Sequence, residues 1–303
     1  MLSPTRTPSH WQIAAHASAL PNPGDFVTAE LTGGTVLVLR DQQGTVRAFR
    51  NLCAHGHHAL VVRASGQLRQ RIECPIHGLA WDLRGAAVPE RGRTGLTSLQ
   101  VQLQQGLIML CTDRASEAAE APSLAWGPEL ALRPAAAPQE FEVQAPWQML
   151  AEQWLEFELP ERPLGRLAGM FTESQRRVEE QSGRILWRAR LDDQASSWYA
   201  RRYTTLARHS AVAEWHRLFL PPNQYIERRE DGLSVLQVIP RDGSQSRLRW
   251  LEYRASAADR RLLAMSFLAR RLRASWLAAD IGAVQSALRF GRFQPAGLHF
   301  THE

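Results

Sequence analysis

Two short segments pair a cysteine with a histidine, and they are the parts of this chain best suited to chemistry. Cys53 and His55 stand one residue apart, Cys74 and His77 stand two apart, and eighteen residues separate the two pairs. Thiolate sulfur and neutral imidazole nitrogen are both strong ligands for iron and zinc. The spacing therefore predicts one metal centre built from two loops, each of which supplies one sulfur and one nitrogen.

This mixed pattern is typical of a Rieske-type [2Fe-2S] cluster, in which two thiolates bind one iron and two imidazoles bind the other. Zinc also accepts two cysteines and two histidines, but zinc fingers usually pair Cys with Cys and His with His. We therefore expect a [2Fe-2S] cluster held by Cys53, His55, Cys74 and His77, with a zinc site as the alternative.

Residues beside the ligands bear on ligation and on reduction potential. His57 and His58 lie near the first loop and could compete as ligands, but the Cys-x-His spacing favours His55, so both are interpreted as surface imidazoles near the cluster that shape a docking patch. Cytochrome bc-type centres carry an extra Cys in each loop and a Ser after the second His, whereas this chain has His58, Ile76 and Leu79 near those places. Fewer hydrogen bonds to the sulfurs lower the potential, which suits electrons from a ferredoxin or flavin reductase rather than from quinol.

Length and composition indicate a folded protein of two domains. The chain has 303 residues, of which 44% are hydrophobic, and no apolar run long enough to span a membrane. The N-terminal sequence lacks a secretory pattern, so we expect a cytoplasmic protein without membrane contact. Cys111, the third cysteine, lies in an apolar stretch and is expected on a buried strand, which leaves no disulfide framework.

The net charge is +6, and every Lys or Arg in the chain is arginine. Arginines in the segment 268–273 recur at helical spacing with leucines between them, which is typical of a solvated helix face rather than a nucleic-acid site. We expect no nucleic-acid partner, whereas an acidic ferredoxin would suit this basic chain.

Hydrophobic patterning predicts the elements that position these residues. Strands are expected between Phe26 and Phe49, with a turn at 41–44, and at 81–83, 99–103 and 107–111. A connector rich in Ala, Pro and Glu follows over 115–138, and we place the domain boundary within it, giving domains 1–125 and 126–303. The second domain is predicted to hold a helix at 147–157, strands at 184–191, 198–205, 216–220, 225–228, 235–239 and 248–254, and a long helix over 257–290.

This order of elements makes an α+β protein and resembles the α subunits of Rieske non-haem iron oxygenases over nearly the whole chain. The likeness rests on both ligand loops, on Leu218-Phe219-Leu220-Pro221-Pro222-Asn223 and on Gln237-Val238-Ile239-Pro240. Gly56-His57 stands where the family usually has Arg-Gly. The resemblance implies an N-terminal all-β Rieske domain followed by a helix-grip-like antiparallel sheet with a long C-terminal helix.

In that family the second domain binds a mononuclear iron through two histidines and a carboxylate. The matching histidine positions here are Leu159 and Leu164, which have no lone pair to offer, so we expect no mononuclear Fe(II). Asp280 matches the carboxylate ligand, and Glu156 matches the acid that bridges electron transfer between subunits. Each has an ordinary alternative as an exposed acid on a helix.

The resemblance implies an electron-transfer subunit in a trimer or hetero-oligomer, which feeds a mononuclear iron in a partner chain that hydroxylates or demethylates a small organic molecule. One alternative is a self-sufficient oxygenase whose iron is held by Asp280 with Glu156, Glu158 or Glu161. Another is a non-enzymatic redox or ligand sensor. His209, His216, His299 and His302 show no spacing that would rebuild an iron site.

Overall fold

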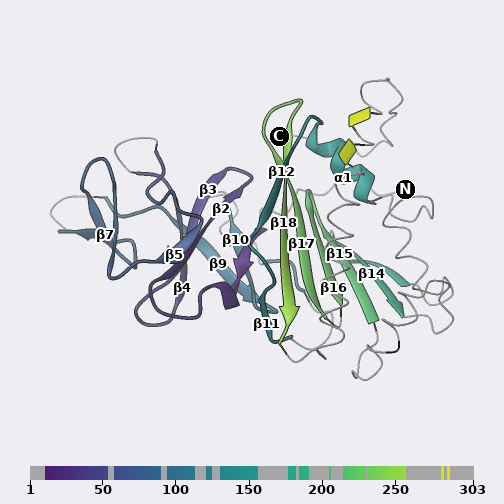
Figure 1. The fold of residues 1–303 in the computed structure, drawn as a ribbon, viewed down its shortest axis with the longest axis horizontal. Helices are drawn as coiled ribbons and strands as arrows, with labels where there is room; N and C mark the ends of the chain where they lie inside the picture. The colour runs from purple at the N-terminus through teal and green to yellow at the C-terminus, as the bar shows by residue number, and fades with distance from the viewer. Residues whose placement is uncertain are drawn as a thin grey trace. The chain divides into compact units, whose positions relative to one another are not determined.

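The computed structural model describes two compact units of the chain. One is Ser9–Glu129 and the other runs from Leu130 onward. The described residues are 11–53, 58–89, 94–112, 121–124, 130–155, 177–181, 184–190, 205, 214–229, 231–256, 281–282 and 285–286. Their secondary structure is mostly β-strand (Figure 1). Among these described residues, helix is limited to α1 (Trp147–Leu155), the 3-10 turn η1 (Ala17–Ala19), residue 205 and residues 281–282 and 285–286.

A seven-stranded antiparallel sheet forms the N-terminal unit. The strand order is β1-β10-β9-β4-β3-β2-β5. The strands are β1 (Trp11–His16), β2 (Asp25–Leu31), β3 (Gly34–Arg40), β4 (Val46–Arg50), β5 (Ser65–Gln67), β9 (Ser98–Gln104) and β10 (Leu107–Cys111). A separate three-stranded sheet contains β6 (Arg71–Glu73), β7 (Ala80–Asp82) and β8 (Ala87–Val88).

Strand β3 contains a continuous apolar run because both of its faces are buried. Val36 and Val38 pack into one buried cluster, whereas Leu37 and Leu39 pack into another. Successive side chains of a strand point to opposite faces, so both faces of this strand are covered. The second cluster also contains Cys53 and Cys74, so the core supports the two ligand loops directly.

The turn between β3 and β4 is fixed by a buried carboxylate. Asp41 is fully buried and accepts hydrogen bonds from the backbone N–H groups of Gln43 and Thr45 and from Arg47 Nε, the last at 2.6 Å. Gly44 adopts a positive φ of 83°, which glycine adopts without strain. The predicted hairpin with a turn at 41–44 is confirmed.

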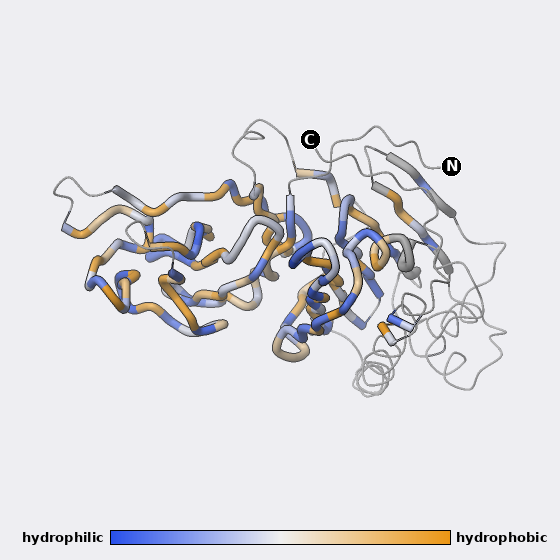
Figure 2. The backbone as a smooth tube through the Cα atoms, turned by 90° about the horizontal axis from the view of Figure 1, so that it is seen from above, coloured by the Kyte–Doolittle hydropathy of each residue, from blue (hydrophilic) through white to orange (hydrophobic). Residues whose placement is uncertain are grey.

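The second unit is an eight-stranded antiparallel sheet in the order β11-β18-β17-β16-β15-β14-β13, with β12 also paired to β18. The strands are β11 (Leu132–Pro134), β12 (Gln139–Val143), β13 (Arg177–Gln181), β14 (Arg184–Arg190), β15 (Glu214–Leu220), β16 (Gln224–Arg229), β17 (Gly232–Pro240) and β18 (Ser246–Ala255). Hydrophobic and hydrophilic residues alternate along many of the described strands of both units (Figure 2).

Most predicted strands that fall on described residues are confirmed, including buried Cys111 on β10. The connector predicted over 115–138 is wrong in part, because β11 lies within it and pairs with β18. The strand predicted at 198–205 lies outside the described residues except for residue 205, which is helical. The long helix predicted over 257–290 likewise lies outside them, except that 281–282 and 285–286 are helical.

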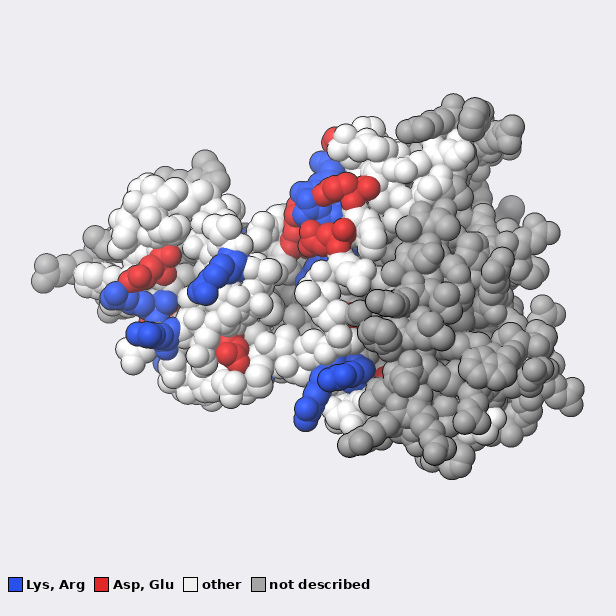
Figure 3. Space-filling model, in the orientation of Figure 1, with Lys and Arg blue, Asp and Glu red and all other residues white. Residues whose placement is uncertain are grey.

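Charged side chains of both signs lie next to one another on the face shown in Figure 3. On β18, Arg247 pairs with Glu140 at 3.0 Å and also with Glu142, both from β12. Such exposed pairs contribute at most about 1 kcal/mol each.

Candidate metal centre

The second ligand loop is a tight turn between β6 and β7. Cys74 N–H donates to Leu79 O at 2.7 Å, and Gly78 N–H donates to Cys74 O at 3.1 Å. Gly78 has a φ of 64° with open space where a Cβ would stand. A non-glycine residue there would be strained by about 1–2 kcal/mol. These bonds fix the backbone that carries Cys74 and His77.

The first ligand loop begins after β4 and is closed by Asn51. The Asn51 side chain is buried, donates from Nδ2 to Val61 O at 2.8 Å and accepts from Val61 N–H at 2.9 Å. Cys53 N–H also donates to His58 O at 3.0 Å. Asn51 therefore joins the two ends of the loop that presents the first cysteine, a role that its place beside the Cys-x-His motif did not reveal.

Four potential ligands from the two loops converge. The ligand atoms of Cys53, His58, Cys74 and His77 all lie within 4.8 Å of one another. Cys53 Sγ and Cys74 Sγ lie 3.6 and 3.5 Å from His77 Nδ1, and His58 Nε2 lies 3.2 Å from Cys74 Sγ. Both cysteines are buried, at 5% and 2% exposure, whereas His77 is exposed. Sulfur therefore faces the core and imidazole faces the solvent.

The surroundings of Cys74 favour its thiolate. Burial opposes the charged form, but hydrogen bonds from His58 and from the backbone amides of His77 and Ile76 outweigh it and lower the pKa of Cys74 to about 6. A thiol with this pKa is mostly ionised at pH 7. Because thiolate is the form that binds metal, Cys74 is prepared for ligation.

These donors fit a [2Fe-2S] cluster. Two buried thiols and two imidazoles, one of each from either loop, are the types of donor that such a cluster needs. The structure brings together Cys53, Cys74 and His77 as predicted, whereas predicted ligand His55 lies outside the described residues.

His58 is the residue of this site that sequence reasoning misjudged. It was interpreted as a surface imidazole, but the structure places its ring against Cys74 Sγ, with its centroid 5.2 Å from that of the His77 ring. Spacing alone cannot reveal this contact, because it depends on how the first loop folds back. The available signal was the position of His58 near the extra cysteine of bc-type loops.

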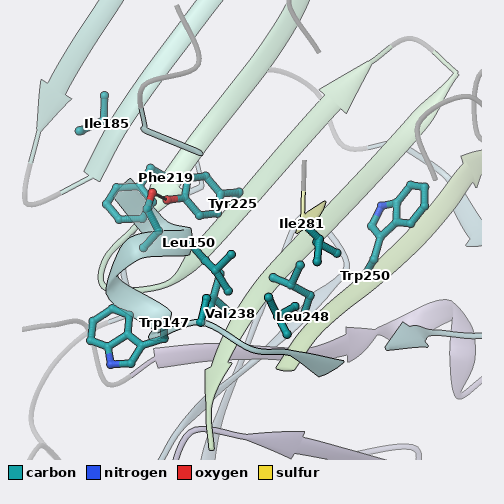
Figure 4. Close-up of a cluster of buried hydrophobic side chains, with 12 residues drawn as sticks. Trp147, Leu150, Ile185, Phe219, Tyr225, Val238, Leu248, Trp250 and Ile281 are labelled. Carbon is teal, nitrogen blue, oxygen red and sulfur yellow. Dashed lines mark hydrogen bonds between the residues drawn. The ribbon is translucent and has the colours of Figure 1, made fainter. Parts of the chain in front are cut away.

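The predicted site residues of the second unit, Glu156, Leu159, Leu164 and Asp280, lie outside the described residues. Described residues near two of these positions in sequence are shown in Figure 4. Trp147 and Leu150 belong to α1, which ends just before Glu156, and Ile281 follows Asp280; all three belong to one buried cluster on the sheet. Tyr225 Oη donates to Ala151 O at 2.5 Å and ties α1 to β16.

A buried charged network occupies neighbouring positions of the same sheet, and sequence patterning gave no sign of it. Arg229 pairs with Glu227 and Asp231 at 3.3 Å and with Glu252 at 3.6 Å, and it donates to Ser234 Oγ at 3.0 Å. The Arg229, Asp231 and Glu252 side chains are 10%, 2% and 7% exposed. Arginine suits this task because its five N–H donors diverge in a plane.

His216, one of the histidines weighed for a rebuilt iron site, is buried beside Arg228, whose Nη1 lies 3.5 Å from His216 Nδ1. Within the described ranges it joins no group of metal-ligand side chains. None of the described helices is both long enough and apolar enough to cross a membrane.

Comparison with known proteins agrees with this centre. The family profile of the Rieske [2Fe-2S] domain matches residues 10–100. The carnitine monooxygenase oxygenase subunit of Escherichia coli (strain K12) is 37% identical over 75 residues, which are 25% of this chain and 20% of that protein. The large oxygenase component of the naphthalene 1,2-dioxygenase system of Pseudomonas aeruginosa is 36% identical over 76 residues, 25% of this chain and 17% of that protein. The matched segment thus spans a fifth or less of these relatives.

Solved structures extend the likeness in fold to the rest of the chain. A quaternary ammonium Rieske monooxygenase in complex with an inhibitor has a TM-score of 0.73 at 19% identity, covering 94% of this chain and 80% of that one. Naphthalene 1,2-dioxygenase from Rhodococcus sp. has a TM-score of 0.67 at 15% identity, covering 91% and 77%.

The N-terminal unit is thus a Rieske [2Fe-2S] domain. With the fold of the whole chain added, the predicted resemblance to the α subunits of Rieske oxygenases is confirmed.

Proposed function

We propose that this protein is an electron-transfer component of the Rieske oxygenase α-subunit type. It accepts electrons from a ferredoxin or flavin reductase and passes them to a mononuclear iron in a partner subunit, where a small organic substrate is hydroxylated or demethylated. The observation that carries the proposal is the convergence of Cys53, Cys74 and His77 from two loops, with the cysteines buried and His77 exposed.

In this proposal the cluster is held by Cys53, His55, Cys74 and His77. The buried thiolates of Cys53 and Cys74 bind one iron, and the two imidazoles bind the iron nearer the surface. The cluster supplies one-electron redox chemistry. Exposed His77 and its neighbour Ile76, which is 67% exposed, offer the partner a contact with little protein in between.

The two domains take different roles. Residues 1–125 form the redox domain, and residues 126–303 form a helix-grip-like domain closed by the C-terminal helix. Leu159 and Leu164 leave that domain without mononuclear iron, Asp280 is the vestige of its carboxylate ligand, and Glu156 bridges electron transfer to the partner. The described part of this domain supports the fold through its eight-stranded sheet and α1.

Partners follow from the same argument. One solved relative, a quaternary ammonium Rieske monooxygenase, is described as using inter-subunit electron transfer. We extend that arrangement to this chain as a trimer or hetero-oligomer with an iron-competent subunit. The proposal places it in the cytoplasm, without membrane or nucleic-acid partners.

Metal analysis and electron paramagnetic resonance of anaerobically purified protein test the proposal. We expect two irons and two acid-labile sulfides per chain, with a Rieske signal after reduction. Cys74→Ser should abolish the cluster, whereas Cys111→Ser, which removes a buried cysteine of β10, should retain it. A third iron would contradict the absence of mononuclear iron, and a colourless protein without sulfide would contradict the whole proposal.

Purification from the native host tests the partner. An iron-competent oxygenase chain should co-purify with this protein. Self-association with no such chain bound would contradict the role as an electron donor to a partner.

A further inference from the structure

His58 makes a contact that the ligand set does not use. Its Nε2 lies 3.2 Å from Cys74 Sγ, and its backbone carbonyl accepts from Cys53 N–H at 3.0 Å. The residue is half-buried between the two loops. Its backbone is thus bonded to one cysteine, and its ring is directed at the sulfur of the other cysteine.

The direction of this hydrogen bond follows from the chemistry of the sulfur. A thiolate bound to iron carries no proton, so the hydrogen between the two atoms must belong to the imidazole. His58 therefore donates from Nε2, and Cys74 Sγ accepts. A donor of this kind stabilises negative charge on the sulfur.

Resting on the proposed function, we propose that His58 is a positioning residue of the cluster that raises its reduction potential through the hydrogen bond to Cys74 Sγ. Reduction adds an electron to the cluster, and a hydrogen bond to a ligand sulfur stabilises the reduced form more than the oxidised form. Because the chain lacks the extra cysteines and the serine of bc-type centres, few hydrogen bonds to the cluster sulfurs are expected from its sequence. His58 lies near the place of one of those cysteines in the first ligand loop, and it supplies such a bond.

Backbone donors also reach this sulfur. His77 N–H donates to Cys74 Sγ at 3.3 Å, and the Ile76 amide bonds it as well. Main-chain groups stay in place when a side chain is replaced. The His77 and Cys53 side chains also lie near Cys74 Sγ, but both are assigned as cluster ligands, so His58 is the side-chain partner that mutation can remove without removing a ligand.

Three variants of the full-length chain separate this role from ligation. His58→Ala removes the donor, His58→Gln keeps an amide N–H at similar reach, and His57→Ala changes the adjacent histidine as a control. Iron and sulfide content, the resonance spectrum and the midpoint potential are measured for each. We expect an intact cluster in all three, a more negative potential in His58→Ala, and potentials close to the wild type in the other two.

Other outcomes overturn the inference in distinct ways. Loss of the cluster in His58→Ala but not in His55→Ala would make His58 a ligand. A potential unchanged in His58→Ala, or lowered equally in His58→Gln, would show that the hydrogen bond does not set it. A wild-type protein without a cluster would instead refute the proposed function, before any variant is compared.

Discussion

Replacement of Asn51 by alanine should open the first ligand loop. The side chain makes two hydrogen bonds to the backbone of Val61, at 2.8 and 2.9 Å, and is 1% exposed. Each such bond contributes about 1 kcal/mol, and a buried backbone group left without a partner costs about 1–3 kcal/mol. We therefore expect Asn51→Ala to lower the free energy of unfolding of the Rieske domain by about 2–4 kcal/mol.

Urea unfolding followed through cluster absorbance measures this effect together with cluster content. Asn223→Ala is the matched control, because Asn223 is equally buried and donates to Val238 O in the second unit. The control should lose stability without loss of cluster. If Asn51→Ala unfolds within about 0.5 kcal/mol of the wild type and keeps its full cluster, Asn51 does not hold the loop closed.

Three further predictions follow. In the metal-free chain the pKa of Cys74 is lowered from its ordinary value to about 6. Between about pH 6 and 9 the unfolded state therefore binds more protons than the folded state, so the free energy of unfolding should rise as the pH rises through this range and fall on acidification. The urea midpoint of Cys74→Ser should lack this pH dependence. Arg229→Ala removes the partner of the buried Asp231 and Glu252 carboxylates and of partly exposed Glu227, and it should cost about 3–5 kcal/mol, whereas Arg247→Ala, at exposed pairs, should cost about 1 kcal/mol or less in the same unfolding assay. Leu159→His combined with Leu164→His should add a third iron per chain by metal analysis; an unchanged iron content would mean that the surrounding pocket has diverged.

Patterns that depend on near neighbours predicted much of the fold. Val36 to Leu39 indicated a strand because β-branched and aliphatic residues fit a sheet covered on both faces. The Asp41 turn followed from residues that favour turns. Both features are local, so the sequence holds all of the information that they need.

Features that depend on distant partners escaped prediction. Strand β11 is short and contains Pro134, so it gives little signal by itself, and its pairing with β18 more than a hundred residues later defines it. Arg229 is charged, so its burial depends on Asp231 in the turn after β16 and on Glu252 of the distant strand β18. His58 reaches Cys74 because of the path of the loop, which spacing does not encode.

The ligand loops take their shape from bonds between protein groups. Asn51 closes one loop, and the Cys74–Leu79 backbone pair closes the other. A scaffold protein that delivers a preassembled cluster therefore meets main chain that is already hydrogen-bonded at Cys53 and at Cys74. Delivery then requires an exchange of sulfur and nitrogen ligands, and maturation of this protein should depend on access to exposed His77.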